Sequence, residues 1–409
     1  MGNLTLNGAT SGQITLAPTA VAGTNTITLP AATGTVLTTA GGQTISGNTT
    51  VSGTVVMGSS FLRNRIINGA MVIDQRNAGA SLTPSNGTYN VDRWLTNLTQ
   101  SSKFSIQQNA GSVTPPTGFS NYLGVTSLSA YSVLSGDTFL LEQDIEGFNF
   151  YDFNFGSASA KTLTISFYVY SSLTGTFGGA IANSAGTRSY PFSYSIASAN
   201  TWTQISITIP GDTTGTWIGA TNGIGLRVRF GLGSGSTYTG TANVWAASNL
   251  VQPTGTTSVV GTNGATFYIT GVQLEIGTAA TPFEYRNYQQ ELAMCQRYFQ
   301  IAGSGGYGSF DNSTTTIQMT EKLIIPMRTQ PTGAIRSGVT AAFRSSGSDF
   351  TTASPALANF TTNPSAIGDG IAFWTQVTGF TGGTLNAVAN SRNNQVTNGG
   401  AFINLSAEL

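Results

Sequence analysis

Histidine is absent from all 409 residues of this chain. Its absence excludes every Ser-His-Asp or Cys-His triad and every metal site built on an imidazole. Glycosidases and polysaccharide depolymerases need only two carboxylates, so they stay open. The Gly-rich stretch 230–236 lacks the lysine and the helix of a phosphate-binding loop, and it is expected to be a turn. No cofactor is therefore expected.

Charge is also scarce. Charged residues make up 8% of the chain and the formal net charge is +0, against about 25% charged residues in ordinary soluble domains. Lysine occurs only at Lys103, Lys161 and Lys322, and the absence of a basic run argues against a nucleic-acid partner. With 39% hydrophobic residues the chain should fold. Its Thr-, Ser- and Asn-rich surface fits either carbohydrate binding or a repetitive β shaft.

Sulfur and long apolar runs are equally rare. The lone Cys295 excludes an intrachain disulfide framework, and its setting predicts a packed small hydrophobe. No stretch of 18 apolar residues occurs, so no membrane span is predicted. The first residues lack the charged and apolar regions of a signal peptide. The sequence therefore predicts a protein that is made and assembled in a reducing cytoplasm.

Short β repeats characterise residues 1–60. Ile14 and Leu16 alternate with polar residues, as do Ile27 and Leu29, and two similar six-residue segments follow each other over 44–55. So few repeats cannot bury an apolar face alone. We therefore expect an N-terminal attachment or shaft segment whose apolar face is covered by partner chains, three around one axis.

Residues 61–286 are expected to form a jelly-roll-like β-sandwich. The clearest strand lies over 162–170, where Leu163, Ile165, Phe167 and Val169 share one face. Further strands are predicted over 202–209, 226–230 and 267–274, and Trp202 is predicted to be a core residue. Regular strands separated by Gly/Ser/Thr turns favour a two-sheet sandwich.

One helix interrupts this all-β pattern, over residues 287–301. Tyr288, Leu292, Cys295 and Phe299 recur at helical spacing, and we expect this stripe to pack near the threefold axis of a homotrimer. After the helix, residues 302–409 are expected to form a small C-terminal β knob. The predicted fold class is thus all-β, with one short linking helix between two β regions.

Three segments carry a family resemblance. Along the chain these are the Thr-rich segment GQITLAPTAVAGTNTITLPAATGTVLTT, then NRIINGAM with VIDQRN and VDRW from Asn64 to Trp94, and then GVQLEIGTAATPFEYRNYQQELAMCQRYFQ, which begins at Gly271. They resemble the receptor-binding type of bacteriophage tail fibre proteins, as in cyanophages and other marine phages. The resemblance implies a homotrimer in the virion tail, which attaches to a tail, baseplate or tail-tube protein at one end and to the host surface at the other.

Aromatic residues in Gly- and Asn-rich settings are the carbohydrate-binding candidates, because aromatic faces stack on the C–H faces of sugars while amides and carboxylates bind the hydroxyls. The alternative for each is a place in the core. The candidates are Tyr238, Asn243, Trp245, Tyr307, Asp369, Trp374 and Gln376.

The densest acidic cluster lies in LEQDIEGFNFYDF. If residues 140–148 form a strand, Glu142, Asp144 and Glu146 share one face. They could be catalytic carboxylates, a calcium site or, as a structural alternative, a solvated strand face or an interchain contact with arginines. The structural alternative is preferred, so no catalytic or metal site is predicted.

Three functions follow from these patterns. The first is a non-catalytic tail fibre that binds a glycan of the host surface. The second is a tailspike-type polysaccharide depolymerase, and the third is a purely structural baseplate or tail component. The first is the prediction, and it makes the chain a binding protein rather than an enzyme.

Overall fold

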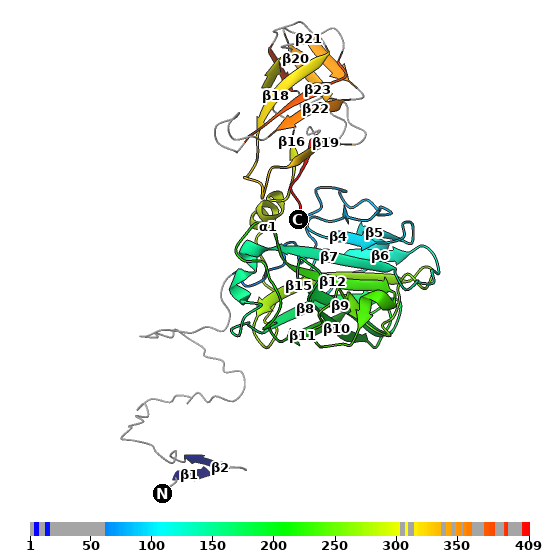
Figure 1. Cartoon of the computed structure of the whole chain (residues 1–409), viewed down its shortest axis with the longest axis vertical. Helices are drawn as coiled ribbons and strands as arrows, with labels where there is room; N and C mark the ends of the chain where they lie inside the picture. The colour runs from blue at the N-terminus through cyan, green and yellow to red at the C-terminus, as the bar shows by residue number, and fades with distance from the viewer. Residues whose placement is uncertain are drawn as a thin grey trace. The chain divides into compact units, whose positions relative to one another are not determined.

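The computed structural model divides the chain into two compact units, Met1–Gly58 and Ser59–Leu409 (Figure 1). It describes residues 4–7, 13–16, 62–302, 307–309, 315–336, 341–345, 348–352, 355–361, 372–380, 388–391 and 403–409. In the first unit β1 (Leu4–Asn7) pairs with β2 (Gln13–Leu16) in an antiparallel hairpin. The predicted strand around Ile27 and Leu29 and the repeat over 44–55 lie outside the described residues.

Two antiparallel sheets form the sandwich of the second unit. The six-stranded sheet has the order β10-β9-β12-β7-β4-β3, and the five-stranded sheet has the order β11-β8-β15-β6-β5. Many sheet neighbours are distant in sequence, as in a jelly roll. The strands of the six-stranded sheet are β3 (Thr88–Tyr89), β4 (Leu95–Leu98), β7 (Thr138–Glu146), β9 (Gly175–Ala182), β10 (Ser189–Ile196) and β12 (Ile224–Ser234). Those of the five-stranded sheet are β5 (Phe104–Gln108), β6 (Leu123–Ser127), β8 (Leu163–Ser171), β11 (Thr203–Ile209) and β15 (Thr266–Ile276). The prediction of an all-β, jelly-roll-like fold is confirmed.

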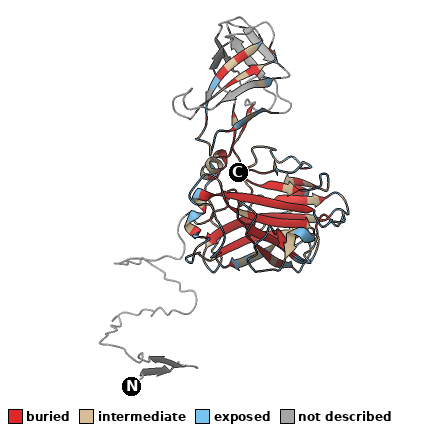
Figure 2. Ribbon diagram, in the orientation of Figure 1, coloured by how far each residue is buried: buried red, intermediate tan, exposed pale blue. Residues whose placement is uncertain are grey.

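Alternation along each strand builds the core between the two sheets. On β8 the predicted inward residues Leu163, Ile165, Phe167 and Val169 are all at most 1% exposed. The facing strands contribute residues such as Phe230, whose ring packs edge-on against Phe167 with 5.0 Å between centroids. Figure 2 shows this buried interior as a continuous red zone along the sandwich strands. The period of two therefore determines which face of each strand is apolar.

A bulge in β15 depends on one glycine. The register of β15 against β8 shifts between Thr270 and Gln273, and Gly271 has φ +62° in this bulge. A Cβ atom on Gly271 would lie 2.6 Å from Cζ of Phe119. Only glycine satisfies both the left-handed backbone and this close approach.

The single α-helix among the described residues, α1 (Tyr288–Gln296), has Asn287 as its N-terminal capping residue. The Asn287 side chain accepts a hydrogen bond from the backbone N–H of Gln290. The helix ends at Gln296, and Phe299 already belongs to β16 (Phe299–Ala302), paired with Ser406. The prediction of a helix over 287–301 was therefore too long, because the alternating pairing of a strand replaces helical spacing at Phe299.

The C-terminal part contains two further sheets and its own core. A three-stranded sheet has the order β16-β25-β19, and a seven-stranded sheet has the order β21-β20-β24-β17-β18-β23-β22. Buried residues such as Ile317, Val377, Ile403 and Leu405 form one cluster there. The strands are β17 (Tyr307–Ser309), β18 (Thr316–Lys322), β19 (Thr332–Ile335), β20 (Ala341–Ser345), β21 (Ser348–Thr352), β22 (Ala356–Thr361), β23 (Ala372–Thr378), β24 (Val388–Ser391) and β25 (Ile403–Ser406).

Short elements complete the sandwich. They are the 3-10 turns η1 (Ala110–Ser112), η2 (Gly147–Asn149), η3 (Tyr151–Phe153) and η4 (Ser236–Tyr238), and the parallel pair β13 (Thr239–Gly240) and β14 (Gln252–Pro253). Among the residues that the structure describes, no helix has the length and apolar character to cross a bilayer.

Candidate functional site

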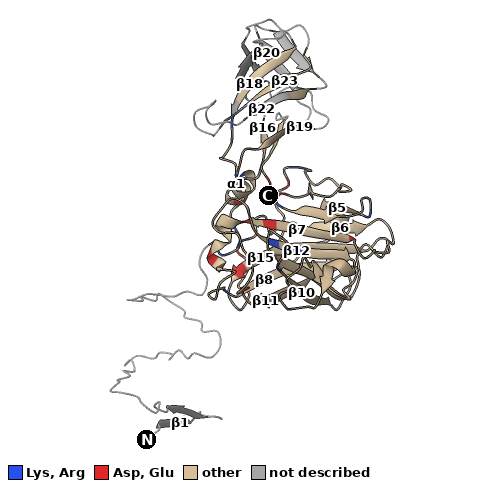
Figure 3. Cartoon of the chain, viewed as in Figure 1, with Lys and Arg blue, Asp and Glu red and all other residues tan. Residues whose placement is uncertain are grey.

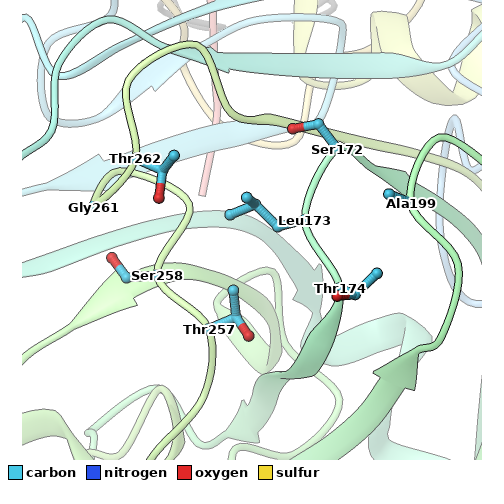
Figure 4. Close-up of a pocket in the computed structure, with 8 residues that line it drawn as sticks. All are labelled: Ser172, Leu173, Thr174, Ala199, Thr257, Ser258, Gly261 and Thr262. Atoms are coloured by element: carbon cyan, nitrogen blue, oxygen red, sulfur yellow. The ribbon is translucent and has the colours of Figure 1, made fainter.

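An open cavity of about 540 Å³ lies at one end of the five-stranded sheet (Figure 4). Three segments surround it: residues 172–174 just after β8, Ala199 shortly before β11, and the loop 257–262 before β15. Its volume falls within the ~300–1,000 Å³ of typical small-molecule sites. The cavity is thus formed by loops that three neighbouring strands bring together.

Hydroxyl groups dominate the cavity wall. The eight lining residues are Ser172, Leu173, Thr174, Ala199, Thr257, Ser258, Gly261 and Thr262, and none of them is charged. Ser172 Oγ already accepts a hydrogen bond from the backbone N–H of Thr266 at 2.9 Å. In contrast, Ser258 Oγ is buried and has no hydrogen-bond partner within the described part of the chain. A buried hydroxyl without a partner is costly, but this oxygen has almost no exposed surface, so a ligand would reach it only if the Ser258 side chain rotated toward the cavity.

The loop that carries Ser258 is held rigidly by the core. Val259 and Val260 are fully buried, and both backbone N–H groups donate to the carbonyl of Leu232, at 2.8 and 3.1 Å. The backbone N–H of Thr257 donates to the carbonyl of Thr176 at 2.7 Å. Val259 and Val260 therefore hold this Thr/Ser/Gly-rich loop against the core. Their neighbours Thr257, Ser258 and Thr262 line the cavity.

Aromatic side chains flank the cavity on the outer face of the same sheet. Tyr170 lies two residues before Ser172, or about 7 Å along the strand, and its ring is 5.5 Å from that of Trp202. Both side chains are half-buried. Trp202 donates from Nε1 to the carbonyl of Thr114 at 2.8 Å. The prediction that Trp202 belongs to the sandwich core is wrong, because it precedes β11 and packs on the outside of the sheet.

Tyr268 connects this aromatic group across the sheet. Its ring is stacked on that of Tyr170 with an interplanar angle of 5° and on that of Tyr122 with 29°. Gly124 is paired with Tyr268 in the register, and a Cβ there would lie 2.8 Å from the Tyr268 ring. The absence of a side chain at Gly124 gives the ring its place. These tyrosines were not predicted, although their outward position in alternating strands was a usable signal.

The predicted sugar-binding residues around Trp245 lie apart from this cavity. Trp245 is half-buried and packs edge-on against Phe155 and Trp217, with 5.7 and 5.8 Å between ring centroids. Its Nε1 donates to the carbonyl of Pro210 at 2.9 Å. Trp245 therefore packs against the sandwich core with part of its surface exposed, and its role in glycan binding stays a prediction.

Tyr238 and Asn243 precede Trp245 in the same segment of the chain. Tyr238 ends η4, and its carbonyl accepts from the backbone N–H of Val251 at 2.9 Å. Asn243 is exposed, with φ +61°. Neither lines a cavity described for this chain.

The remaining sugar-binding candidates belong to the seven-stranded sheet. Tyr307 lies on β17, where it is paired with Thr320 and Asn390. Trp374 and Gln376 lie on β23, where the register pairs them with Thr320 and Gln318 of β18. Asp369 lies outside the described residues. Their role in glycan binding stays a prediction.

The acidic residues on β7 are buried and paired with arginines. Glu142 Oε2 lies 2.5 Å from Nε of Arg229, and both side chains are 3% exposed. Asp144 lies 3.5 Å from Arg227, and burial together with the nearby Glu142 raises the pKa of Asp144 to about 7. The idea of a solvated strand face is therefore wrong, and the arginine partners of Glu142 and Asp144 come from the same chain rather than from a neighbouring one.

Glu146, the third acidic residue of the cluster, has two partners. Its carboxylate lies 2.6 Å from Nη2 of Arg297 and accepts from the hydroxyl of Tyr298 at 2.7 Å. Burial opposes its ionisation, but these hydrogen bonds outweigh burial and lower its pKa. In the described part of the chain, no group of three or more acidic or cysteine residues has the arrangement of a metal site.

The residues predicted to pack near a threefold axis have different surroundings. Tyr288 is 60% exposed, whereas Cys295 is 0% exposed and packs with Ile67, Ile73 and Tyr298 of the same chain. Leu292 is half-buried beside this cluster, and Phe299 is 2% exposed. Cys295 and Phe299 are thus covered by their own chain, and only Tyr288 and part of Leu292 stay accessible.

Comparisons with known proteins give distant structural matches only. No family model and no curated protein matches the chain. The chain is similar to the enzymatically active domain of tailspike protein 4 of bacteriophage CBA120, with 12% identity and a TM-score of 0.27 over 48% of this chain and 21% of that one. It is similar to a putative sugar binding protein from Bacteroides thetaiotaomicron, with 12% identity and a TM-score of 0.31 over 53% and 100%. A family 11 carbohydrate-binding module of Clostridium thermocellum matches with 17% identity and a TM-score of 0.24 over 49% and 97%. Matches at this level carry no argument about the function of this chain.

Proposed function

We propose that this chain is a non-catalytic, glycan-binding fibre protein that attaches a phage-like particle to its host. The observation that carries the glycan-binding part is the cavity lined by serine and threonine residues, beside the half-buried pair Tyr170 and Trp202. The fibre role rests on the three sequence segments that resemble tail fibre proteins. The neighbouring structures whose names refer to sugar binding and to a phage tailspike are in keeping with this proposal but do not carry it.

Binding would use the two halves of the site for the two kinds of sugar surface. Sugar hydroxyls donate to and accept from the serine and threonine hydroxyls of the cavity, because each such group can do both. The C–H face of an adjacent sugar contacts the exposed parts of Tyr170 and Trp202. An open site gives modest affinity, and several copies on one particle raise the overall affinity through effective concentration.

A homotrimer is part of this proposal, as is attachment to a tail or baseplate protein through residues 1–60. The protein would then act in the virion tail. Adsorption would make and break no covalent bond. The trimer is supported by the sequence pattern of residues 1–60, in which so few repeats need partner chains to cover their apolar face.

A depolymerase is the competing proposal, and the carboxylates of β7 do not favour it. A glycosidase places two carboxyl groups ~5–9.5 Å apart on either side of a glycosidic bond. Glu142 and Asp144 are 2% and 4% exposed and face arginines instead. Reducing ends released continuously from host polysaccharide, and lost in Glu142→Gln, would overturn the non-catalytic proposal.

Adsorption is tested with purified, labelled full-length chain on intact candidate host cells. We expect binding that disappears when the surface polysaccharide is removed beforehand. Binding that persists without the polysaccharide would point to a protein receptor. Absence of binding by a chain of verified oligomeric state would favour a structural tail component.

A further inference from the structure

We propose that the cavity at the end of the five-stranded sheet takes an uncharged segment of the glycan and discriminates against sugars that carry carboxylate, sulfate or phosphate. This inference rests on the proposed glycan-binding function and adds the chemical class of the ligand. It follows from the cavity wall, which contains serine and threonine residues and no charged side chain.

An acidic sugar would find no suitable partner in this wall. Carboxylates and sulfates are usually bound by Arg or Lys, in charge-assisted hydrogen bonds about twice as strong as neutral ones. An ionised group that binds in this open cavity gives up part of its hydration, and neutral hydroxyls return less for it than an Arg or Lys would. A neutral sugar loses only hydroxyl–water hydrogen bonds, which the wall can replace.

Three threonine hydroxyls are available for that replacement. Thr174, Thr257 and Thr262 line the cavity, and their hydroxyls make no hydrogen bond with any other described residue. Each can donate and accept. The pattern matches the mixed donor and acceptor groups of a neutral sugar rather than an anion, which accepts only.

Charged groups near the loop are already engaged elsewhere. The loop residue Val260 accepts from the backbone N–H of Tyr131 at 2.9 Å. The Tyr131 ring lies 4.5 Å from Nζ of Lys103, and its hydroxyl donates to Asp137 at 2.8 Å. The two opposite charges thus contact the same tyrosine, and neither side chain lines the cavity.

The rest of the described chain supplies little positive field. Every ion pair in this part of the chain uses an arginine, and several of these arginines are almost fully buried, as Arg93, Arg229 and Arg286 are. Figure 3 shows charged positions as isolated patches among neutral ones on the sandwich strands. With a net charge of +0 the chain lacks the electrostatic attraction that acidic polysaccharides would need.

The test uses the surface polysaccharide of a host to which the chain binds. Anion exchange separates the extract into an uncharged and a charged fraction, and each fraction is immobilised and titrated with the full chain. We expect binding to the uncharged fraction, with an affinity that changes less than about twofold between about 50 and about 500 mM NaCl, because no charge is screened. Binding to the charged fraction alone, weakened by salt, would overturn this inference while leaving glycan binding intact. Cell binding that does not depend on polysaccharide would overturn the proposed function itself.

Variants connect the result to the cavity. The double variant Thr257→Val with Thr262→Val removes two hydroxyls and keeps the branched shape of both side chains. Loss of two hydrogen bonds should weaken binding by at least about tenfold. Thr213→Val is the matched control, because Thr213 is exposed and does not line the cavity. Wild-type affinity in the folded double variant would exclude the cavity as the site.

Thr262→Lys tests the charge argument in the opposite direction. Thr262 is exposed at the cavity, so a lysine there can reach solvent and still face a ligand. The variant should gain salt-sensitive binding to the charged fraction and should not gain affinity for the uncharged one. A variant that binds the charged fraction no better than wild type would contradict the reasoning.

Discussion

Glu408 holds the C-terminal residues against the sandwich through a buried ion triad, which makes a sharp stability prediction. Its carboxylate forms ion pairs with Arg93 and, at 2.5 Å, with Arg76. The exposed fractions of the side chains are 7% for Glu408 and 1% for Arg93. The guanidinium of Arg93 also lies 3.6 Å from the ring centroid of Tyr298. Burial lowers the pKa of Arg93, but the surrounding acidic groups, Glu408 foremost, together outweigh burial and the net shift is upward.

The perturbation is Glu408→Gln, which keeps the shape of the side chain and removes its charge. Arg93 would then stay buried without a counter-charge, a situation that costs about 3–5 kcal/mol. Because Arg93 keeps its contact with Tyr298, we expect about 3 kcal/mol. Urea unfolding followed by tryptophan fluorescence measures it, since Trp94 is 0% exposed in the sandwich.

Two further variants make the measurement decisive. Asp152→Asn removes a similar ion pair with Arg65. The Arg65 side chain is 24% exposed and that of Asp152 is 33% exposed, so the loss of stability should not exceed about 1 kcal/mol. Replacing Arg93 and Glu408 together by methionine removes both buried charges and should restore most of the lost stability. If Glu408→Gln and Asp152→Asn unfold at the same urea concentration, the triad does not stabilise the fold as argued.

Three other predictions concern single residues. Burial raises the pKa of Asp92 from 3.8 to about 6. The folded state therefore binds the proton more tightly than the unfolded state, and the free energy of unfolding should fall as the pH rises from about 4 to about 6. Asp92→Asn should reduce this slope in a pH series of unfolding measurements, and an unchanged slope would disprove the role of Asp92. Gly271→Ala should destabilise by about 1–3 kcal/mol through its φ of +62° and its contact with Phe119, whereas Gly136→Ala, with open space around it, should be nearly neutral in the same thermal melt. The Cys295 thiol, buried and with its pKa raised, should react with a thiol reagent only in denaturant, and rapid labelling of the native chain would contradict its packed environment.

Strand alternation was the part of the fold that the sequence predicted well. The inward set Leu163, Ile165, Phe167 and Val169 lies on β8 as expected. Such residues repeat with a period of two, which is a local property of the chain. The helix was predicted correctly in kind but not in length, because the strand pairing of Phe299 with Ser406 joins residues far apart in sequence.

The acidic cluster shows where local pattern is insufficient. Alternation places Glu142 and Asp144 on one face of β7, and that was predicted. Whether that face meets water depends on what covers it, and Arg229 and Arg227 come from β12, far along the chain. A sequence pattern gives the direction of a side chain but not its distant neighbour.

The hydroxyl-lined cavity belongs wholly to the tertiary structure. Serine and threonine are common throughout this chain, so nothing in sequence distinguishes Ser258 or Thr262 from the many that lie in ordinary turns. The sequence by itself determined a neutral, histidine-free, all-β protein, because composition and periodicity are properties of short segments. Only the tertiary structure decided which hydroxyls converge, because the three loops around the cavity become neighbours only when β8, β11 and β15 pair side by side.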